Sequence, residues 1–340
     1  MSSQIYPSPR VYNQISRPRK YVKGQRRFSI YWSWSYPWEA NRDLTELDNR
    51  FSSMTEVRRV AWPAYESIEY SEKMFLQGIA GALELFHLGL VNFQELIGSV
   101  TSQPVAVYQR IDQAGQRLPI DNRILADTDT LMIFGLDHML TEQEAAAEEI
   151  DAVKQFLKRE GTCLILGPHH DVGFSEDLNQ RQQEYKHHRD PLVPRQQRFG
   201  KYTRSLMKGL GVPVENRYGL RPATVKGTNN QLVPLSKQMD LDKHKLLEGV
   251  TTFNFHMHLP HYAVTTNDES LIHVLARQPI DMSRPHPFIE AGNSEFNMFL
   301  WMPPAGEIVG DILLADSTIF STLFGVDESL KRFWKNLAML

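Results

Sequence analysis

Two histidines and a carboxylate stand next to each other at His169, His170 and Asp171. They follow the short apolar run TCLILG (162–167), which is typical of a buried strand. In an open α/β sheet, ligands usually bind at the carboxyl ends of the strands. Imidazole can act as a general base near neutral pH, and a neighbouring carboxylate can orient the ring or raise its pKa. We therefore predict a catalytic site centred on these three residues.

A second polar pair, Asp137 and His138, follows the apolar run TLMIFG (130–135). The segment between the two apolar runs has helical periodicity, and Thr141 and Glu144 match the capping box that marks a helix start. Strand, helix and strand with short loops predict a parallel crossover. Its two strands would end at the same edge of the sheet, so we add Asp137 and His138 to the predicted catalytic site. The alternative is that they form only a helix-entry turn.

The same edge offers candidate metal ligands, because imidazole and carboxylate groups are ordinary ligands of zinc and iron. If residues 250–259 form a strand, His256 and His258 lie on one face of it. We predict His169, Asp171, His256 and His258 as the ligand set, with zinc or iron as the metal. The alternative is that the histidines of this strand are half-buried and bonded to backbone carbonyls.

Aromatic residues cluster near the first predicted strand, FSIYWSW (28–34). Alternation along a strand sends Tyr31 to one face and Trp32 to the other, so part of this cluster belongs to the core. Tyr36 and Trp38 fall beyond the strand end, where they could line the mouth of a pocket and bind a small-molecule substrate.

Composition bounds the class of protein. With a net charge of −3, the chain gives no electrostatic reason to expect nucleic-acid binding. The longest apolar run, 79–91, is broken by Glu84 and His87 and is too short to span a bilayer. The single cysteine, Cys163, excludes an intrachain disulfide and fits a reducing compartment. We expect a cytoplasmic protein that binds neither nucleic acid nor membrane.

The chain divides into two parts of different composition. Residues 1–26 are basic and poor in aliphatic side chains, which favours a disordered arm or one that docks on a partner. Residues 27–340 are expected to form a single α/β domain, with a helical insertion at about 66–100. Through the arm we expect a homo-oligomer or a complex with another protein.

The order of these segments resembles that of the class I glutamine amidotransferase-like superfamily, in its branches without amidotransferase activity, such as the trehalose-utilisation type. One shared feature is the apolar strand that ends at Gly167. Another is HKLLEGVTTF (244–253), similar to the family's His-Pro-Leu-x-x-Gly-Val turn, with Lys245 in place of proline. The last is GEIVGDILLADSTIF (306–320), similar to a strand with an Asp-Ser turn, followed by a terminal helix.

The resemblance covers roughly 27–62 and 103–340, and it implies a flavodoxin-like, mostly parallel sheet flanked by helices. Amidotransferases of this superfamily carry a cysteine nucleophile after the strand, where this chain has Pro168 and His169. Cys163 stands inside the predicted strand, where its side chain should point into the core. We therefore exclude a cysteine-dependent glutamine amidotransferase.

Two functions remain open. The first is a small-molecule enzyme, such as a metal-assisted hydrolase or lyase, in which the rings of His169 and His170 must reach a solvent-accessible hollow. The second is a non-catalytic binding or scaffold subunit that kept the fold and lost the nucleophile. Fold resemblance alone does not distinguish them.

Overall fold

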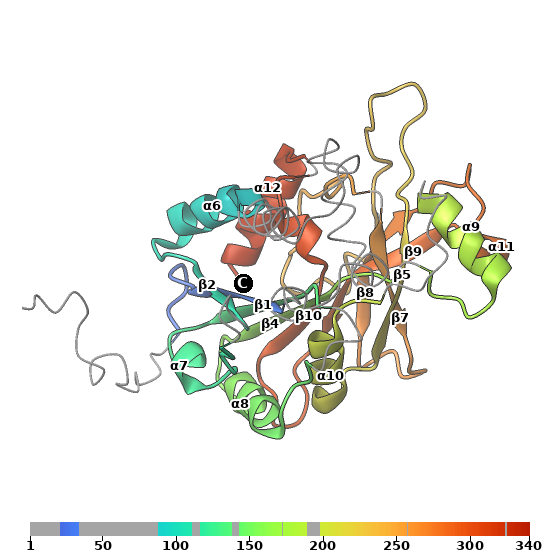
Figure 1. The fold of residues 1–340 in the computed structure, drawn as a ribbon. Coiled ribbons are helices and arrows are strands. Elements are labelled where there is room, and N and C mark those ends of the chain that lie inside the picture. Colours follow the sequence, from blue (N-terminus) through green and yellow to red (C-terminus); the bar gives the residue numbers. More distant parts are fainter. Residues whose placement is uncertain are drawn as a thin grey trace, which may run out of the picture.

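The apolar runs predicted as buried strands lie at the centre of an eight-stranded sheet. The computed structural model describes residues 21–33, 88–110, 116–137, 143–171, 173–188, 198–256, 258–323 and 325–340. In spatial order the strands of the sheet are β2 (Ala106–Gln109), β1 (Phe28–Ser33), β3 (Thr130–Gly135), β4 (Cys163–Pro168), β10 (Asp311–Leu314), β9 (Glu295–Met302), β8 (His273–Pro279) and β6 (Ser236–Lys237) (Figure 1).

The first five strands in this order, from β2 to β10, are parallel to one another. When these five strands are numbered by their order along the chain, their spatial order is 2-1-3-4-5, which is that of flavodoxin-like folds. The remaining strands, β9, β8 and β6, extend the sheet in antiparallel fashion. The predicted fold class, a flavodoxin-like and mostly parallel sheet flanked by helices, is confirmed.

Strands β3 and β4 are buried along their whole length, as expected for a parallel sheet that is covered on both faces. Their register pairs Thr130 with Cys163 and Gly135 with Pro168. The predicted crossover helix between them is α8 (Ala147–Leu157). Because the two strands end at the same level, the turns that carry Asp137 and His169 leave the sheet side by side.

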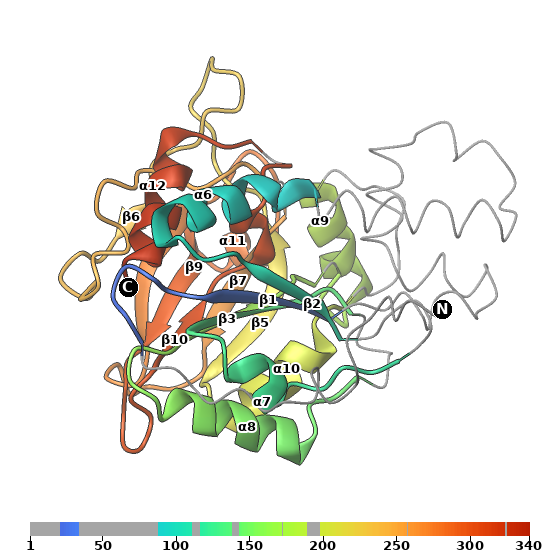
Figure 2. The same ribbon diagram turned by 90° about the vertical axis from the view of Figure 1, so that its left-hand side faces the viewer.

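Helices cover both faces of the sheet (Figure 2). On one face lie α8, α7 (Asn122–Leu125) and α10 (Lys201–Leu210), and on the other lie α6 (Val91–Thr101) and α12 (Glu328–Ala338). Two core clusters result, one on each face. Tyr31 belongs to the cluster beneath α8 and α10, whereas Trp32 belongs to the cluster beneath α6 and α12. The predicted alternation of β1 is therefore confirmed.

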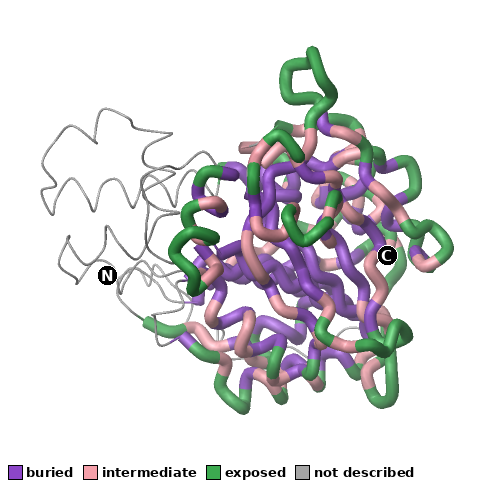
Figure 3. Tube along the Cα trace, turned by 90° about the vertical axis from the view of Figure 1, so that its right-hand side faces the viewer, coloured by how far each residue is buried: buried purple, intermediate pink, exposed green. Residues whose placement is uncertain are grey.

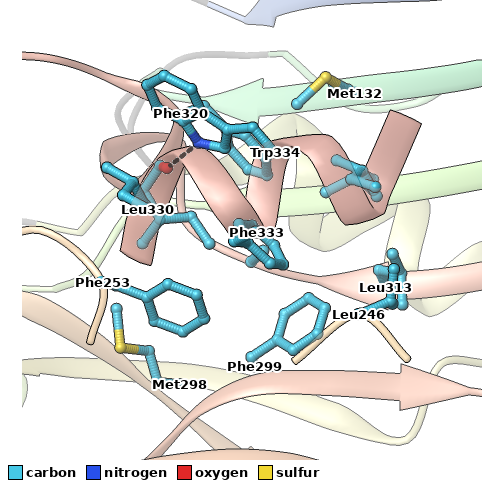
Figure 4. Packing of buried hydrophobic residues seen from close by; sticks show 14 of the residues in the cluster. Met132, Leu246, Phe253, Met298, Phe299, Leu313, Phe320, Leu330, Phe333 and Trp334 are labelled. Carbon is cyan, nitrogen blue, oxygen red and sulfur yellow. Dashed lines mark hydrogen bonds between the residues drawn. The ribbon is translucent and has the colours of Figure 1, made fainter. Parts of the chain in front are cut away.

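The apolar side chains of α12 form a large part of the cluster beneath α6 and α12 (Figure 4). Leu330, Phe333 and Trp334 of α12 are fully buried. The ring centroids of Phe333 and Phe253 are 5.0 Å apart. The Trp334 indole N–H donates to the Ile319 carbonyl at 2.8 Å. Because α12 closes one face of the sheet, it is a structural element of the core.

A second, two-stranded sheet pairs β5 (Val214–Leu220) with β7 (Leu259–Val264) in antiparallel fashion. Helices α9 (Leu178–His188) and α11 (Pro287–Glu290) lie together at this end of the molecule (Figure 1). The buried trace follows the inner strands, and the exposed residues gather in the outer loops (Figure 3).

The strand predicted over 250–259 is wrong for most of its length, since residues 251–256 have no strand structure and β7 begins at Leu259. Side chains form hydrogen bonds that take the place of those to a neighbouring strand. The hydroxyl of Ser329 accepts from the amides of Thr251 and Thr252, at 2.8 and 3.0 Å. The side-chain amide of Asn254 donates to the Ser321 carbonyl at 2.9 Å. These contacts fasten the segment to the region around α12.

The crossover helix also starts later than predicted, because α8 begins at Ala147. Thr141 lies outside the described residues, and Glu144 precedes the helix. Glu149 supplies part of the cap instead, since its carboxylate accepts from the Ala146 amide at 3.0 Å.

The predicted arm and insertion lie largely outside the described residues. Of the arm, only 21–26 is described, and it packs on its own chain: the Arg26 guanidinium is buried and donates to the Thr130 hydroxyl (2.8 Å) and the Leu340 carbonyl (2.7 Å). Of the insertion, α6 is described and packs against α12. Among the described residues, no helix has both the length and the apolar character needed to cross a membrane.

Candidate functional site

Four imidazole rings gather at the carboxyl end of β4. The rings of His169 and His170 have centroids 4.1 Å apart, and the His256 ring lies 6.1 Å from each of them. The His258 ring lies 5.2 Å from that of His170. We call His169, His170, His256 and His258 the histidine cluster. The structure thus brings together the two histidine pairs that the sequence singled out, although a loop rather than a strand carries His256.

A carboxylate from the neighbouring strand faces this cluster. Asp316 follows β10, which lies beside β4 in the sheet, and its Oδ2 is 3.2 Å from Nδ1 of His169. Its Oδ1 accepts from the Thr318 amide at 2.9 Å and thereby caps the short helix η2 (Ser317–Phe320). Burial raises the pKa of Asp316, but the His169 and Thr318 contacts outweigh it and hold this pKa below its ordinary value. His169 therefore faces an ionised carboxylate.

Asp171 makes its contacts with a different part of the molecule. Its Oδ1 lies 2.5 Å from Nη2 of Arg204 and accepts from the Phe199 amide at 3.1 Å, while its Oδ2 lies 3.2 Å from Nε of Arg198. The side chain is fully buried. Burial raises its pKa, and the two guanidinium groups act in the opposite direction. The contacts make Asp171 an anchor for the start of α10.

Asp137 also holds the start of α10. Its Oδ1 accepts from the Ser33 hydroxyl at 2.6 Å, and its Oδ2 accepts from the Tyr202 amide at 2.9 Å. Burial raises its pKa. Asp137 thus joins α10 to the ends of β1 and β3, which is the point where the strand order reverses. His138, Tyr36 and Trp38 lie outside the described residues.

The described residues do not supply the metal site predicted from the sequence. The carboxylate of Asp171 is directed at two arginines. The ring of His256 donates through Nδ1 to the His258 carbonyl at 3.1 Å, which is the backbone-bonded alternative. Within the described ranges, no three His, Cys, Asp or Glu side chains are arranged to hold a metal ion. Zinc or iron therefore does not fit these residues as they are placed.

The histidine cluster is largely enclosed. The exposed fraction is 7% for His169 and 1% for His170. The two rings therefore expose little surface to solvent, and a substrate can reach His169 only if neighbouring residues move.

Glycine is needed where β5 passes the cluster. A Cβ atom on Gly219 would stand 2.6 Å from Cδ2 and 2.8 Å from Cγ of the His170 ring. These separations are far below ordinary van der Waals contact, so the backbone approaches His170 only because residue 219 has no side chain.

We expect Gly219→Ala to displace the His170 ring and to lower the free energy of unfolding by about 1–3 kcal/mol, as overpacking does elsewhere. Denaturant unfolding and the imidazole signals in NMR spectra measure the two effects. Gly98→Ala in α6 is the matched control, because a Cβ there meets its nearest atom at 3.6 Å and alanine favours a helix. Unchanged stability and unchanged His170 signals in Gly219→Ala would contradict this packing.

The sequence interpretation missed the link between Asp316 and His169 and the roles of Arg198 and Arg204. Asp316 was not among the predicted site residues, although its position after the apolar run of β10 was a usable signal. The two arginines follow Asp171 by 27 and 33 residues, so no local pattern indicated their contact with it.

No family model matches the chain, and a search of curated proteins finds no match. Among solved structures, the N-terminal domain of mmIFT52 is similar, with a TM-score of 0.39 and 9% identity, over 89% of this chain and 92% of that one. A likeness at this level carries no inference about function.

Proposed function

We propose that the chain is a small-molecule enzyme, a hydrolase or a lyase, in which His169 is the general acid–base group and Asp316 orients its ring. The contact of 3.2 Å between Asp316 and His169 at the carboxyl edge of the parallel strands supports this proposal. Nδ1 faces the carboxylate, so Nε2, on the opposite side of the ring, exchanges the proton with water or substrate. The carboxylate stabilises the imidazolium that forms.

The neighbouring rings favour a single proton at this site. Two imidazolium ions 4.1 Å apart would repel each other, so protonation of His169 disfavours protonation of His170. His170 and His256 shape the surroundings of the reacting group in this proposal, and no step passes through a metal.

The proposal retains the resemblance to the glutamine amidotransferase-like superfamily without its cysteine chemistry. Cys163 is fully buried in β4, and burial raises the pKa of its thiol. A nucleophilic cysteine needs an exposed, activated thiolate, so these observations support a reaction that does not use Cys163. We further propose a cytoplasmic location and a soluble small-molecule substrate.

Screening the purified protein against esters, amides and other small substrates tests the proposal. We expect His169→Gln to reduce the activity found by about 100-fold, as loss of a general base does. His244→Gln is a matched control, because its Nε2 contacts Asp311 at 2.9 Å in another histidine–aspartate pair. Asp316→Asn should lower kcat and kcat/KM together, because the ring loses the carboxylate that orients it and stabilises the imidazolium formed in the reaction. Full activity in both site variants would contradict the proposal.

A second function, a non-catalytic binding or scaffold subunit, is favoured by the burial of His169 and His170. In that case no substrate is turned over, and residues 1–26 join the chain to a second copy or to another protein. Sedimentation of the full chain and of a variant lacking residues 1–20 measures this assembly. We expect the variant to lose the assembly, while His169→Gln keeps it. Equal assembly of the two forms contradicts the scaffold function.

A further inference from the structure

A second group of histidines lies around Tyr218 of β5, apart from the histidine cluster. His187 comes from α9, His286 immediately precedes α11, and His261 lies in β7. The ring centroids of His187 and His286 are 5.0 Å apart. The Tyr218 ring lies 4.8 Å from that of His286 and 5.9 Å from that of His261. All three histidines are buried.

Each of these histidines accepts a hydrogen bond from a backbone amide. Nε2 of His187 accepts from Arg221 at 2.9 Å, and Nδ1 of His261 accepts from Asn297 at 3.3 Å. Nδ1 of His286 accepts from the Phe288 amide at 3.1 Å and caps α11. A ring nitrogen that accepts carries no proton, so all three rings are neutral in this arrangement.

Protonation would break these contacts and place positive charges in a buried space. Burial lowers the pKa of His187 and of His261 to about 4, and it lowers the pKa of His286 well below its ordinary value. The charged and titratable groups that face the three rings are mostly cationic. His187 is faced by Arg221, Arg284 and Asp281, and His261 is faced by Arg217. His286 is faced by the other two histidines, His187 and His261. Tyr218 is faced by Arg217, Glu184 and Glu215.

We propose that His187, His261 and His286 form an acid-sensitive clasp that holds α9 and α11 against β5 and β7 and releases them when the rings take up protons. The folded-state pKa values lie below the ordinary histidine value of 6.5. The docked arrangement is therefore fully favoured above pH 6.5 and is progressively weakened as the pH falls towards 4. At pH 5, His187 alone favours release by about 30-fold.

One group on α9 acts in the opposite direction. Glu184 is buried, and burial raises its pKa to about 7, so its contribution to docking is present at low pH and is lost as the pH rises from 4.5 to 7. Its effect on docking is about equal in size, and opposite in sign, to that of one of the three histidines. With three histidines opposing it, the balance still favours release in acid, by about 30-fold or more at pH 5.

Hydrogen exchange of the full chain, corrected for the intrinsic rate at each pH, tests the clasp. We expect the protection of α9 to fall by about 30-fold or more between pH 7.5 and 5, while β3 and β4 keep theirs. A combined His187→Gln, His261→Asn and His286→Asn variant keeps an acceptor at each position but cannot be protonated. In this variant α9 should keep its protection in acid.

Should the combined variant fail to fold, His286→Asn alone is sufficient, because asparagine is a favourable N-cap. In His286→Asn we expect the loss of α9 protection in acid to be at least 10-fold smaller than in the wild type. The control His273→Gln, at the start of β8, should leave this loss unchanged. Three results would overturn the clasp: equal protection of α9 at both pH values, an undiminished loss in the histidine variants, or a simultaneous loss in β3 and β4.

Discussion

Replacing Glu149 with glutamine is expected to lower the free energy of unfolding by about 3–5 kcal/mol, because it leaves a buried guanidinium without its counter-charge. The two oxygens of Glu149 lie 2.6 and 3.0 Å from the Nη1 and Nη2 atoms of Arg110. Arg110 is fully buried, and Glu149 is 3% exposed. The carboxylate also accepts from the Tyr202 hydroxyl and the Ile120 amide, both at 3.0 Å. One side chain thus connects β2, α8 and α10.

The same pair gives the stability a defined pH dependence. Burial acts to raise the pKa of Glu149, but the hydrogen bonds and charge of Arg110 outweigh it and lower this pKa below its ordinary value. The contribution of Glu149 is therefore present above the ordinary carboxyl pKa and is lost as the pH falls through the folded-state value.

Denaturant unfolding of Glu149→Gln measures the effect. Glu307→Gln is the matched control, since Glu307 also pairs with a cation, Lys158, but is 81% exposed. Exposed ion pairs contribute little, so we expect the control to unfold like the wild type. If Glu149→Gln also unfolds like the wild type, the buried pair does not hold these elements together.

Replacing Asp171 with alanine is expected to lower the free energy of unfolding by about 3 kcal/mol. The change leaves Arg204 and Arg198 facing each other without the anion between them, and it removes the acceptor of the Phe199 amide. Arg204 is the more buried of the two, with 15% of its side chain exposed, so most of the cost arises there. A catalytic role would predict a different result: lost activity with little change in stability.

Unfolding measurements on Asp171→Ala and on the double variant with Arg204→Leu separate the two roles. The double variant removes a buried cation together with its anion, so it should lose less stability than the sum of the single losses. Glu307→Ala, at the exposed pair with Lys158, provides the comparison and should unfold like the wild type. If Asp171→Ala is as stable as the wild type but has lost activity, Asp171 is a catalytic residue, as the sequence predicted.

The parts of the fold that could be predicted are those encoded in local patterns. The continuous apolar runs at 130–135 and 162–167 became β3 and β4, because strands covered on both faces need apolar residues throughout. In α12 the spacing of Leu330, Phe333, Trp334 and Leu337 is likewise that of a helix that buries one face. Strand β5 was not predicted, because VENRYGL has neither an apolar run nor a regular alternation.

The candidate site was only partly predictable, because its contacts depend on which strands become neighbours. His169 and Asp316 are separated by 147 residues and meet only because β10 lies beside β4. No local pattern specifies that neighbour. For the same reason, the adjacent imidazoles suggested a partner for Asp171 that it does not have, and its carboxylate contacts arginines that come later in the chain.

Cys163 is the only cysteine in the chain, and it lies at the start of the buried strand β4 with no exposed surface. An alkylating reagent can therefore modify the natural protein only in molecules whose central strands have separated. The rate of alkylation counts these events without any engineered label. Measured alongside hydrogen exchange, the alkylation rate would distinguish a molecule in which only α9 has undocked from one that has unfolded globally.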